Sequence, residues 1–162
     1  MDTVFFRLAL VFYLAATAGF LYFIIKKNKA AGYWSHRILI VGFALNSVYL
    51  AISYYNLGAL PALTFKSSLS FFAWTIIAAY IIFQFKFRIM VLGSFVIPFS
   101  LFLMVISSAI PISPITVRPI FKSLWLQLHV STSLLGDGIF AIAFIAGIMY
   151  LIQEHQIKTK KL

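Results

Sequence analysis

His129 and Asp137 are the residues whose types and positions best suit chemistry in this apolar chain. His129 lies near the start of the apolar stretch 123–150, and Asp137 is the only acid inside such a stretch. A neutral imidazole can bind haem iron, copper or zinc, and near a membrane interface it does so without a large desolvation cost. The alternative for His129 is a histidine at headgroup depth that hydrogen-bonds to a backbone carbonyl.

Asp137 follows His129 by eight residues, about 12 Å further along a helix at 1.5 Å per residue. A charged acid at that depth in a membrane costs on the order of 3 kcal/mol, so we expect Asp137 to face the helix bundle or a wet cavity. It would then serve as a proton-relay group or as the partner of a cation. The alternative is an acid that is protonated or hydrogen-bonded and has no further role, and the adjacent glycines 136 and 138 suit both readings.

The composition is that of an integral membrane protein. Of the 162 residues, 63% are hydrophobic and only 10% are charged, whereas soluble proteins are near 25% charged. The net charge of +10 comes from short basic clusters beside apolar runs, with no basic face interleaved with aromatic residues, so a nucleic-acid partner is not expected. The chain has no cysteine, which excludes disulfides, thiolate metal sites and thiol redox chemistry. Nor does it contain paired carboxylates or a nucleophile–base arrangement, so we do not expect an enzyme.

Five apolar runs are long enough to cross a hydrocarbon core about 30 Å thick. We therefore predict an all-α fold, a polytopic membrane bundle of about five transmembrane helices that forms a single domain over residues 1–162. A basic loop is expected between the first two spans and a polar tail after the fifth. The expected spans cover about residues 4–25, 38–55, 68–85, 89–110 and 123–152.

The basic residues are unevenly divided between the two sides of this arrangement. Nine of the thirteen lysines and arginines fall on one side, and the positive-inside rule makes that side cytoplasmic. The N-terminus is then outside, the C-terminus is cytoplasmic, and His129 lies at the outer end of the fifth span. We expect a multi-pass protein of the cell (inner or cytoplasmic) membrane. The nine residues are Lys26, Lys27, Lys29, Arg37, Lys86, Arg88, Lys158, Lys160 and Lys161.

Other polar and aromatic residues suggest structural roles. Asn46, in the second span, is expected to hydrogen-bond between helices, and His36 to be solvated in a charged segment. Trp34, Trp74 and Trp125 are expected to anchor span ends at the membrane interface. A small-solute transporter that uses the acid at 137 would be expected to show an inverted repeat or paired broken helices, and the sequence has neither.

Three ordered motifs carry a resemblance to a known family. The first is GALP at residues 58–61 followed by SLSFFAW at 68–74, and the second is LGSFVIP at 92–98. The third is SLWLQLHV at 123–130 with LG at 135–136 and YL at 150–151. With these motifs, over about residues 40–155, the chain resembles the cytochrome c assembly family, in particular its CcsA/HemX-like branch, which is related to CcmC.

The resemblance implies a haem role for the outer end of the fifth span. His129 corresponds to the family's external histidine, an axial ligand of haem iron, and Arg118 and Lys122 would contact haem propionates. Trp125 joins these candidate haem-binding residues. The implied function is a membrane component of cytochrome c biogenesis that binds or relays haem at the outer face, with a partner membrane protein and apocytochrome c. The alternative is a non-catalytic HemX-like subunit or regulator that stabilises a partner and binds no haem.

The sequence departs from the family pattern at several positions. It lacks the tryptophan-rich WWD segment and the second external histidine that normally follow, so haem binding by this chain alone is expected to be weak. Asn46 stands where many members have an intramembrane histidine, Ser67 replaces a glutamate, and Asp137 replaces an aromatic residue. These departures suggest a shortened member, a half that needs a partner chain, or a degenerate copy.

Overall fold

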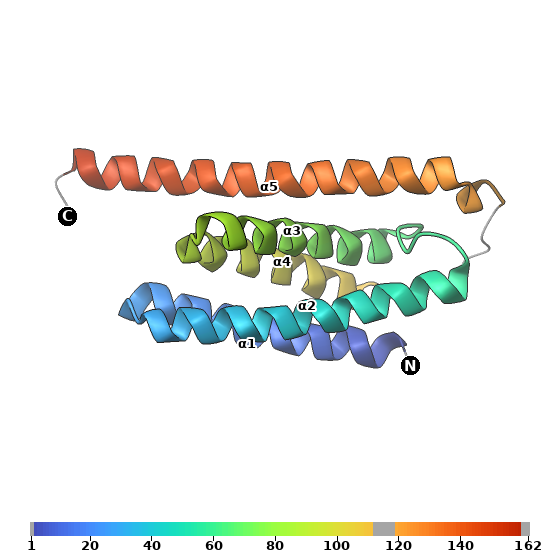
Figure 1. Ribbon diagram of the computed structural model, residues 1–162, viewed down its shortest axis with the longest axis horizontal. Coiled ribbons are helices and arrows are strands. Elements are labelled where there is room, and N and C mark those ends of the chain that lie inside the picture. The colour runs from blue at the N-terminus through green and yellow to red at the C-terminus, as the bar shows by residue number, and fades with distance from the viewer. Residues whose placement is uncertain (1, 112–118, 160–162) are drawn as a thin grey trace.

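The computed structural model describes residues 2–111 and 119–159, and within these ranges the chain is all helical. Successive long helices run in opposite directions, so their connections alternate between the two ends of the bundle (Figure 1). The N-terminus lies at one end and the C-terminus at the other (Figure 1). The elements are α1 (Asp2–Lys26), α2 (Lys29–Leu57), α3 (Phe65–Phe87), α4 (Met90–Ala109), the short 3-10 helix η1 (Pro119–Lys122) and α5 (Leu124–Lys158).

All five α-helices are long and apolar enough to cross a membrane. This confirms the predicted polytopic bundle of about five spans. The most apolar windows of α3 and α4 are 44% and 50% buried inside the protein, whereas that of α5 is only 17% buried. Therefore α3 and α4 form the centre of the bundle, with α1 and α2 on one side and α5 alone on the other (Figure 1).

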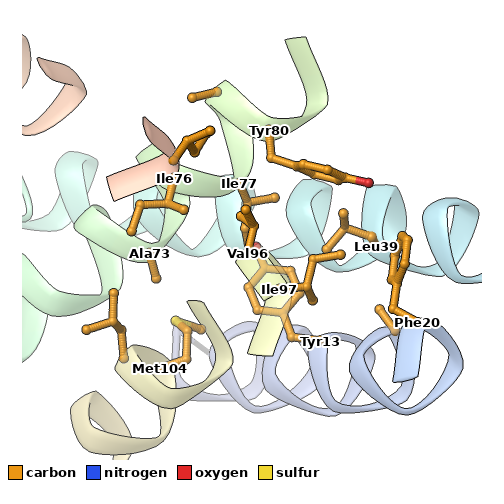
Figure 2. Close-up of a cluster of buried hydrophobic side chains, with 14 of the residues drawn as sticks. Tyr13, Phe20, Leu39, Ala73, Ile76, Ile77, Tyr80, Val96, Ile97 and Met104 are labelled. Atoms are coloured by element: carbon orange, nitrogen blue, oxygen red, sulfur yellow. The ribbon is translucent and has the colours of Figure 1, made fainter. Parts of the chain in front are cut away.

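The core lies mainly where α1, α2, α3 and α4 meet, and α5 adds Ile142 and Ile145 to it. On α1 the buried side chains recur every three or four residues, at Phe6, Ala9, Tyr13, Ala16 and Phe20, which is the period of one helix face. Figure 2 shows how large side chains from the four helices converge. The labelled members of this core are Tyr13, Phe20, Leu39, Ala73, Ile76, Ile77, Tyr80, Val96, Ile97 and Met104.

The basic end of the bundle, where α1 and α3 end and α2 and α4 begin, is more helical than predicted. Lys27, with φ of 53°, ends α1, and the side chain of Asn28 accepts a 3.0 Å hydrogen bond from the Ala30 N–H to start α2. The predicted basic loop therefore shrinks to two residues, and Arg37 lies on α2. The polar tail expected after the fifth span is helical as far as residue 158, because α5 continues through it with an ion pair between Glu154 and Lys158.

Asn46 lies where it was predicted to lie, whereas Trp74 does not. Asn46 is fully buried and its Nδ2 lies 3.5 Å from the hydroxyl of Tyr13 on α1, which agrees with the predicted interhelical role. Trp74, expected at a membrane interface, instead packs inside the bundle. Its indole donates a 2.8 Å hydrogen bond to Ser47 Oγ, and its ring stacks between Phe43 and Phe71 at centroid distances of 5.3 and 5.7 Å.

One close approach attaches α5 to the central pair. The hydroxyl of Thr75 on α3 lies 3.1 Å from the carbonyl oxygen of Leu134 on α5. A Cβ at Gly138 would lie only 3.0 Å from Thr75 Oγ1 and 3.3 Å from the backbone nitrogen of Ile76. The absence of a side chain at Gly138 therefore lets the backbones of α3 and α5 approach each other.

Candidate functional site

The first turns of α5 present two faces of different character. Leu126 and Val130 point into the protein, where they line a cavity of about 130 Å³ with Leu60 and Leu63 of the α2–α3 loop. Helical geometry places Trp125 and His129 together one turn apart, and both side chains are exposed. The candidate ligand therefore lies on the face of α5 that the rest of the described chain leaves uncovered.

The His129 imidazole has no hydrogen bond among the described residues, so neither nitrogen is engaged by a backbone carbonyl. Trp125, 84% exposed, provides a broad apolar surface beside it. Lys122, the last residue of η1, is exposed, and its Cε lies 3.9 Å from where a Cβ of Gly58 would be. Lys122 thus lies over the left-handed turn that ends α2, at the end of the bundle where α5 begins (Figure 1). Arg118, the other proposed propionate contact, lies outside the described residues.

Of the two placements expected for Asp137, the interior of the bundle is not found, and a cavity is found only at its edge. The side chain of Asp137 is exposed, and it lies at the rim of a shallow cavity of about 150 Å³ between α3 and α5. Phe65, Leu69 and Phe72 of α3 form most of the other wall. The reason is the register of α5, because the close packing against α3 is made by the next residue, Gly138. A further helix that packed against the uncovered side of α5 would therefore lie close to Asp137.

The described residues suit a haem that this chain would ligate on one face only. In the described part of the chain, no group of three or more His, Asp or Glu side chains is arranged to hold a metal ion. Haem needs fewer protein donors than a bare ion, because the porphyrin supplies four and the protein adds one or two axial ligands. A free exposed imidazole beside an exposed tryptophan meets the requirement for one axial ligand. His129 is exposed and lies outside the two cavities that α5 lines above, so the second face of the haem would be covered by another helix or chain.

Two residues of the family-like motifs have structural roles here. Ser67, which stands in place of a glutamate, forms a capping box with Thr64 at the start of α3, with hydrogen bonds of 3.2 and 3.1 Å. Trp74 belongs to the aromatic stack described above. Serine at position 67 therefore suits the start of α3. Trp74 joins α3 to α2 through its hydrogen bond to Ser47 and its stacking on Phe43.

His36 is less exposed to solvent than its charged sequence surroundings led us to expect. It is half-buried rather than solvated, with its ring centroid 6.2 Å from that of Tyr80 and 6.4 Å from that of Phe85. It lines a cavity at the basic end together with Gln84 of α3. Their separation of 48 positions in the sequence gave no signal of this pairing, which depends on how α2 packs against α3.

The sequence profile described as "Cytochrome C assembly protein" matches residues 62–162, which include α3, α4 and α5 with His129 and Asp137. The chain belongs to the cytochrome c assembly protein family. This confirms the resemblance drawn from the three motifs, and α3 to α5 lie within the matched residues.

Individual relatives of this cytochrome c assembly family member carry two names. Protein HemX of Bacillus subtilis (strain 168) is 27% identical over 144 residues, which is 86% of this chain and 52% of the relative. Protein HemX of Brevibacillus brevis is 25% identical over 94% of this chain and 57% of the relative. The cytochrome c biogenesis protein CcsA of Guillardia theta is 27% identical over 80% of this chain and 44% of the relative. The chain thus spans about half the length of the curated relatives that it matches, and no solved structure matches it.

Proposed function

We propose that this protein is a membrane component of cytochrome c biogenesis that binds or relays haem at the outer face of the membrane, with His129 as an axial ligand of the iron. Lys122 and Arg118 would hold the propionates, and Trp125 would pack against the porphyrin. The haem group would supply an iron centre that is carried rather than used for catalysis. The residues of this chain would bind it, orient it and leave one side accessible.

The observation that carries this proposal is the free imidazole on the uncovered face of α5. An exposed histidine without a hydrogen bond, beside an exposed tryptophan, offers the ligand and the apolar surface that haem requires, and Lys122 at the same end of the bundle would supply positive charge. Family membership supports this use of the site.

The same face of α5 supports the proposal of a partner in the membrane. The most apolar window of α5 is only 17% buried, and Asp137 is exposed along it. A carboxyl group facing lipid alone is unfavourable, whereas a second helix could supply it with a cation or a hydrogen bond. We propose that a partner membrane protein of the cytochrome c assembly system packs there, provides the second haem ligand, and presents the haem to apocytochrome c.

We expect His129→Ala to weaken haem binding by at least about tenfold, because the one axial bond that this chain provides would be lost. The measurement is a haem titration of the detergent-purified protein, followed by the Soret band. His155→Ala is the matched control, since it removes an exposed histidine from the opposite end of the same helix. His36→Ala is a second control, because it reports haem bound at the other end of the bundle.

The proposal predicts that both controls retain the wild-type titration curve. A Soret band that is indifferent to His129→Ala, or that is lost in His36→Ala instead, would contradict the assignment of the ligand.

A second candidate function is a HemX-like subunit that stabilises a partner and binds no haem. The observations in its favour are that His129 lies outside the two cavities lined by α5, and that two of the relatives are named HemX. This alternative expects that the protein does not shift the Soret band of added haem at any haem concentration, and that His129→Ala has no phenotype.

A further inference from the structure

A cavity of about 640 Å³ opens at the basic end of the bundle, among α1, α2, α3 and the start of α4. Its walls are mainly apolar, but polar side chains enter it from two levels. Gln84 and His36 lie deep, and Lys29 and Arg88 lie at the mouth, where both are exposed. The remaining lining residues are Phe23, Tyr33, Phe85, Ile89, Met90 and Val91.

The deep polar atoms of this cavity have no partner within the protein. Gln84 is only 7% exposed, and its Oε1 has no hydrogen bond among the described residues. The Nδ1 atom of His36 is buried and equally without a partner there. Proteins rarely leave such atoms unpaired, and a carbonyl oxygen can only accept, so a ligand must bring an O–H or N–H donor.

The two cations at the mouth also lack partners. The one ion pair found in the described part of the chain joins Glu154 and Lys158, so no acid neutralises Lys29 or Arg88. Lys29 is the first residue of α2, where a positive charge opposes the helix dipole and therefore does not serve the stability of the helix. Arg88 is fixed in the left-handed conformation, with φ of 53°, by its N–H bond of 3.0 Å to the Gln84 carbonyl.

We infer that this cavity binds the headgroup of an anionic, hydroxyl-bearing phospholipid of the phosphatidylglycerol type. Lys29 and Arg88 hold the phosphate, and the glycerol hydroxyls hydrogen-bond to Gln84 and His36. The exposed apolar side chains of Phe85 and Ile89 beside the mouth meet the start of the acyl chains. Basic pockets between transmembrane helices bind anionic headgroups in this way. The inference concerns the end of the bundle opposite His129 and does not depend on the haem role.

Native mass spectrometry of the full chain in detergent, titrated with phosphatidylglycerol or phosphatidylcholine, tests the inference. We expect phosphatidylglycerol to bind more tightly. The double variant Lys29→Gln/Arg88→Asn should weaken its binding roughly 25-fold, from about fivefold for each cation. Asparagine is chosen at 88 because it tolerates the left-handed backbone.

The matched control is Arg37→Gln/Lys86→Gln, which removes two cations from the same end. Arg37 lies over the ring of Trp34 at 5.1 Å and Lys86 over that of Phe87 at 5.5 Å, and neither lines the cavity. This control should weaken binding less than about threefold, since only diffuse surface charge is lost. Ile89→Trp, which fills the mouth without changing the charge, should weaken binding as the double variant does.

Equal losses in the control and in the cavity variants would overturn the inference, because they would show attraction to charge alone. Wild-type binding by Ile89→Trp would overturn it too. Displacement of the lipid by an equimolar amount of sn-glycerol 3-phosphate would overturn the lipid as the ligand and indicate a soluble phosphate ester instead. Unchanged melting temperatures of the variants would show that any losses reflect binding.

Discussion

Gly93→Ala should lower the free energy of unfolding by about 1–3 kcal/mol, the usual cost of overpacking a core. A Cβ at this position of α4 would lie 2.8 Å from Tyr80 Cζ and 2.9 Å from Phe20 Cε1. Both aromatic residues are fully buried, so neither ring can move aside without disturbing the contacts that join α1, α3 and α4. Thermal or SDS-induced unfolding of the purified protein in detergent would measure the change.

Gly147→Ala on α5 is the matched control for this substitution. A Cβ there would meet no atom within 4 Å, so the same chemical change should be neutral, or should stabilise the helix slightly through the higher propensity of alanine. Equal stability of the Gly93 and Gly147 variants would contradict the packing described for the centre of the bundle.

Gly138→Leu should separate α5 from α3, because the side chain would have to occupy the space now filled by the backbone of Thr75 and Ile76. The chain has no cysteine, so spin labels can be placed at chosen positions only. Labels at Phe83→Cys on α3 and Phe144→Cys on α5, both partly exposed, would report the distance between the two helices by electron paramagnetic resonance. We expect a single narrow distance distribution in the parent protein and a longer, broader one in Gly138→Leu.

Gly136→Leu is the control on the same helix, two residues away. No atom lies within 4 Å of the position of its Cβ, so the distance distribution should stay narrow. A narrow, unshifted distribution in Gly138→Leu would show that α5 is not attached to α3 by this close approach. The result also bears on the candidate site, because α5 carries both His129 and Asp137.

The helical architecture could be predicted because each span is set by local composition. Runs of about twenty apolar residues separated by charged or proline-containing segments define membrane helices without any tertiary information. The helix ends were less predictable, since charged residues such as Lys29 and Arg37 remain solvated on a helix that extends past the apolar region. The predicted second span therefore begins later along the chain than α2 does, and the predicted fifth span ends earlier than α5 does.

The candidate site could be predicted only in part, because its geometry depends on packing. The position of His129 near the start of a span was visible in the sequence, and the structure adds that it faces away from the bundle. The exposure of Asp137 was not visible, because it follows from Gly138 being the residue that contacts α3. The surroundings of Trp74 and Gln84 were equally out of reach, because Ser47, which accepts the hydrogen bond from Trp74, and His36, which lines the same cavity as Gln84, lie on a different helix.

These contacts indicate that α1 to α4 and α5 have different roles in the bundle. The buried core is formed mainly by α1 to α4, and α5 adds Ile142 and Ile145 to it while most of its apolar surface stays uncovered. A helix held in this way can carry a ligand on its free face and still accept a partner. The proposed haem role needs both properties.

The most direct test of that role is a change of axial ligand at His129. Ferric haem bound to the wild-type protein should give the electron paramagnetic resonance spectrum of an imidazole-ligated iron, and His129→Cys should convert it to that of a thiolate-ligated iron. Any thiolate signal must come from position 129, because the chain has no other cysteine. Identical spectra of the two proteins would contradict axial ligation by His129 and with it the central claim of a haem site on α5.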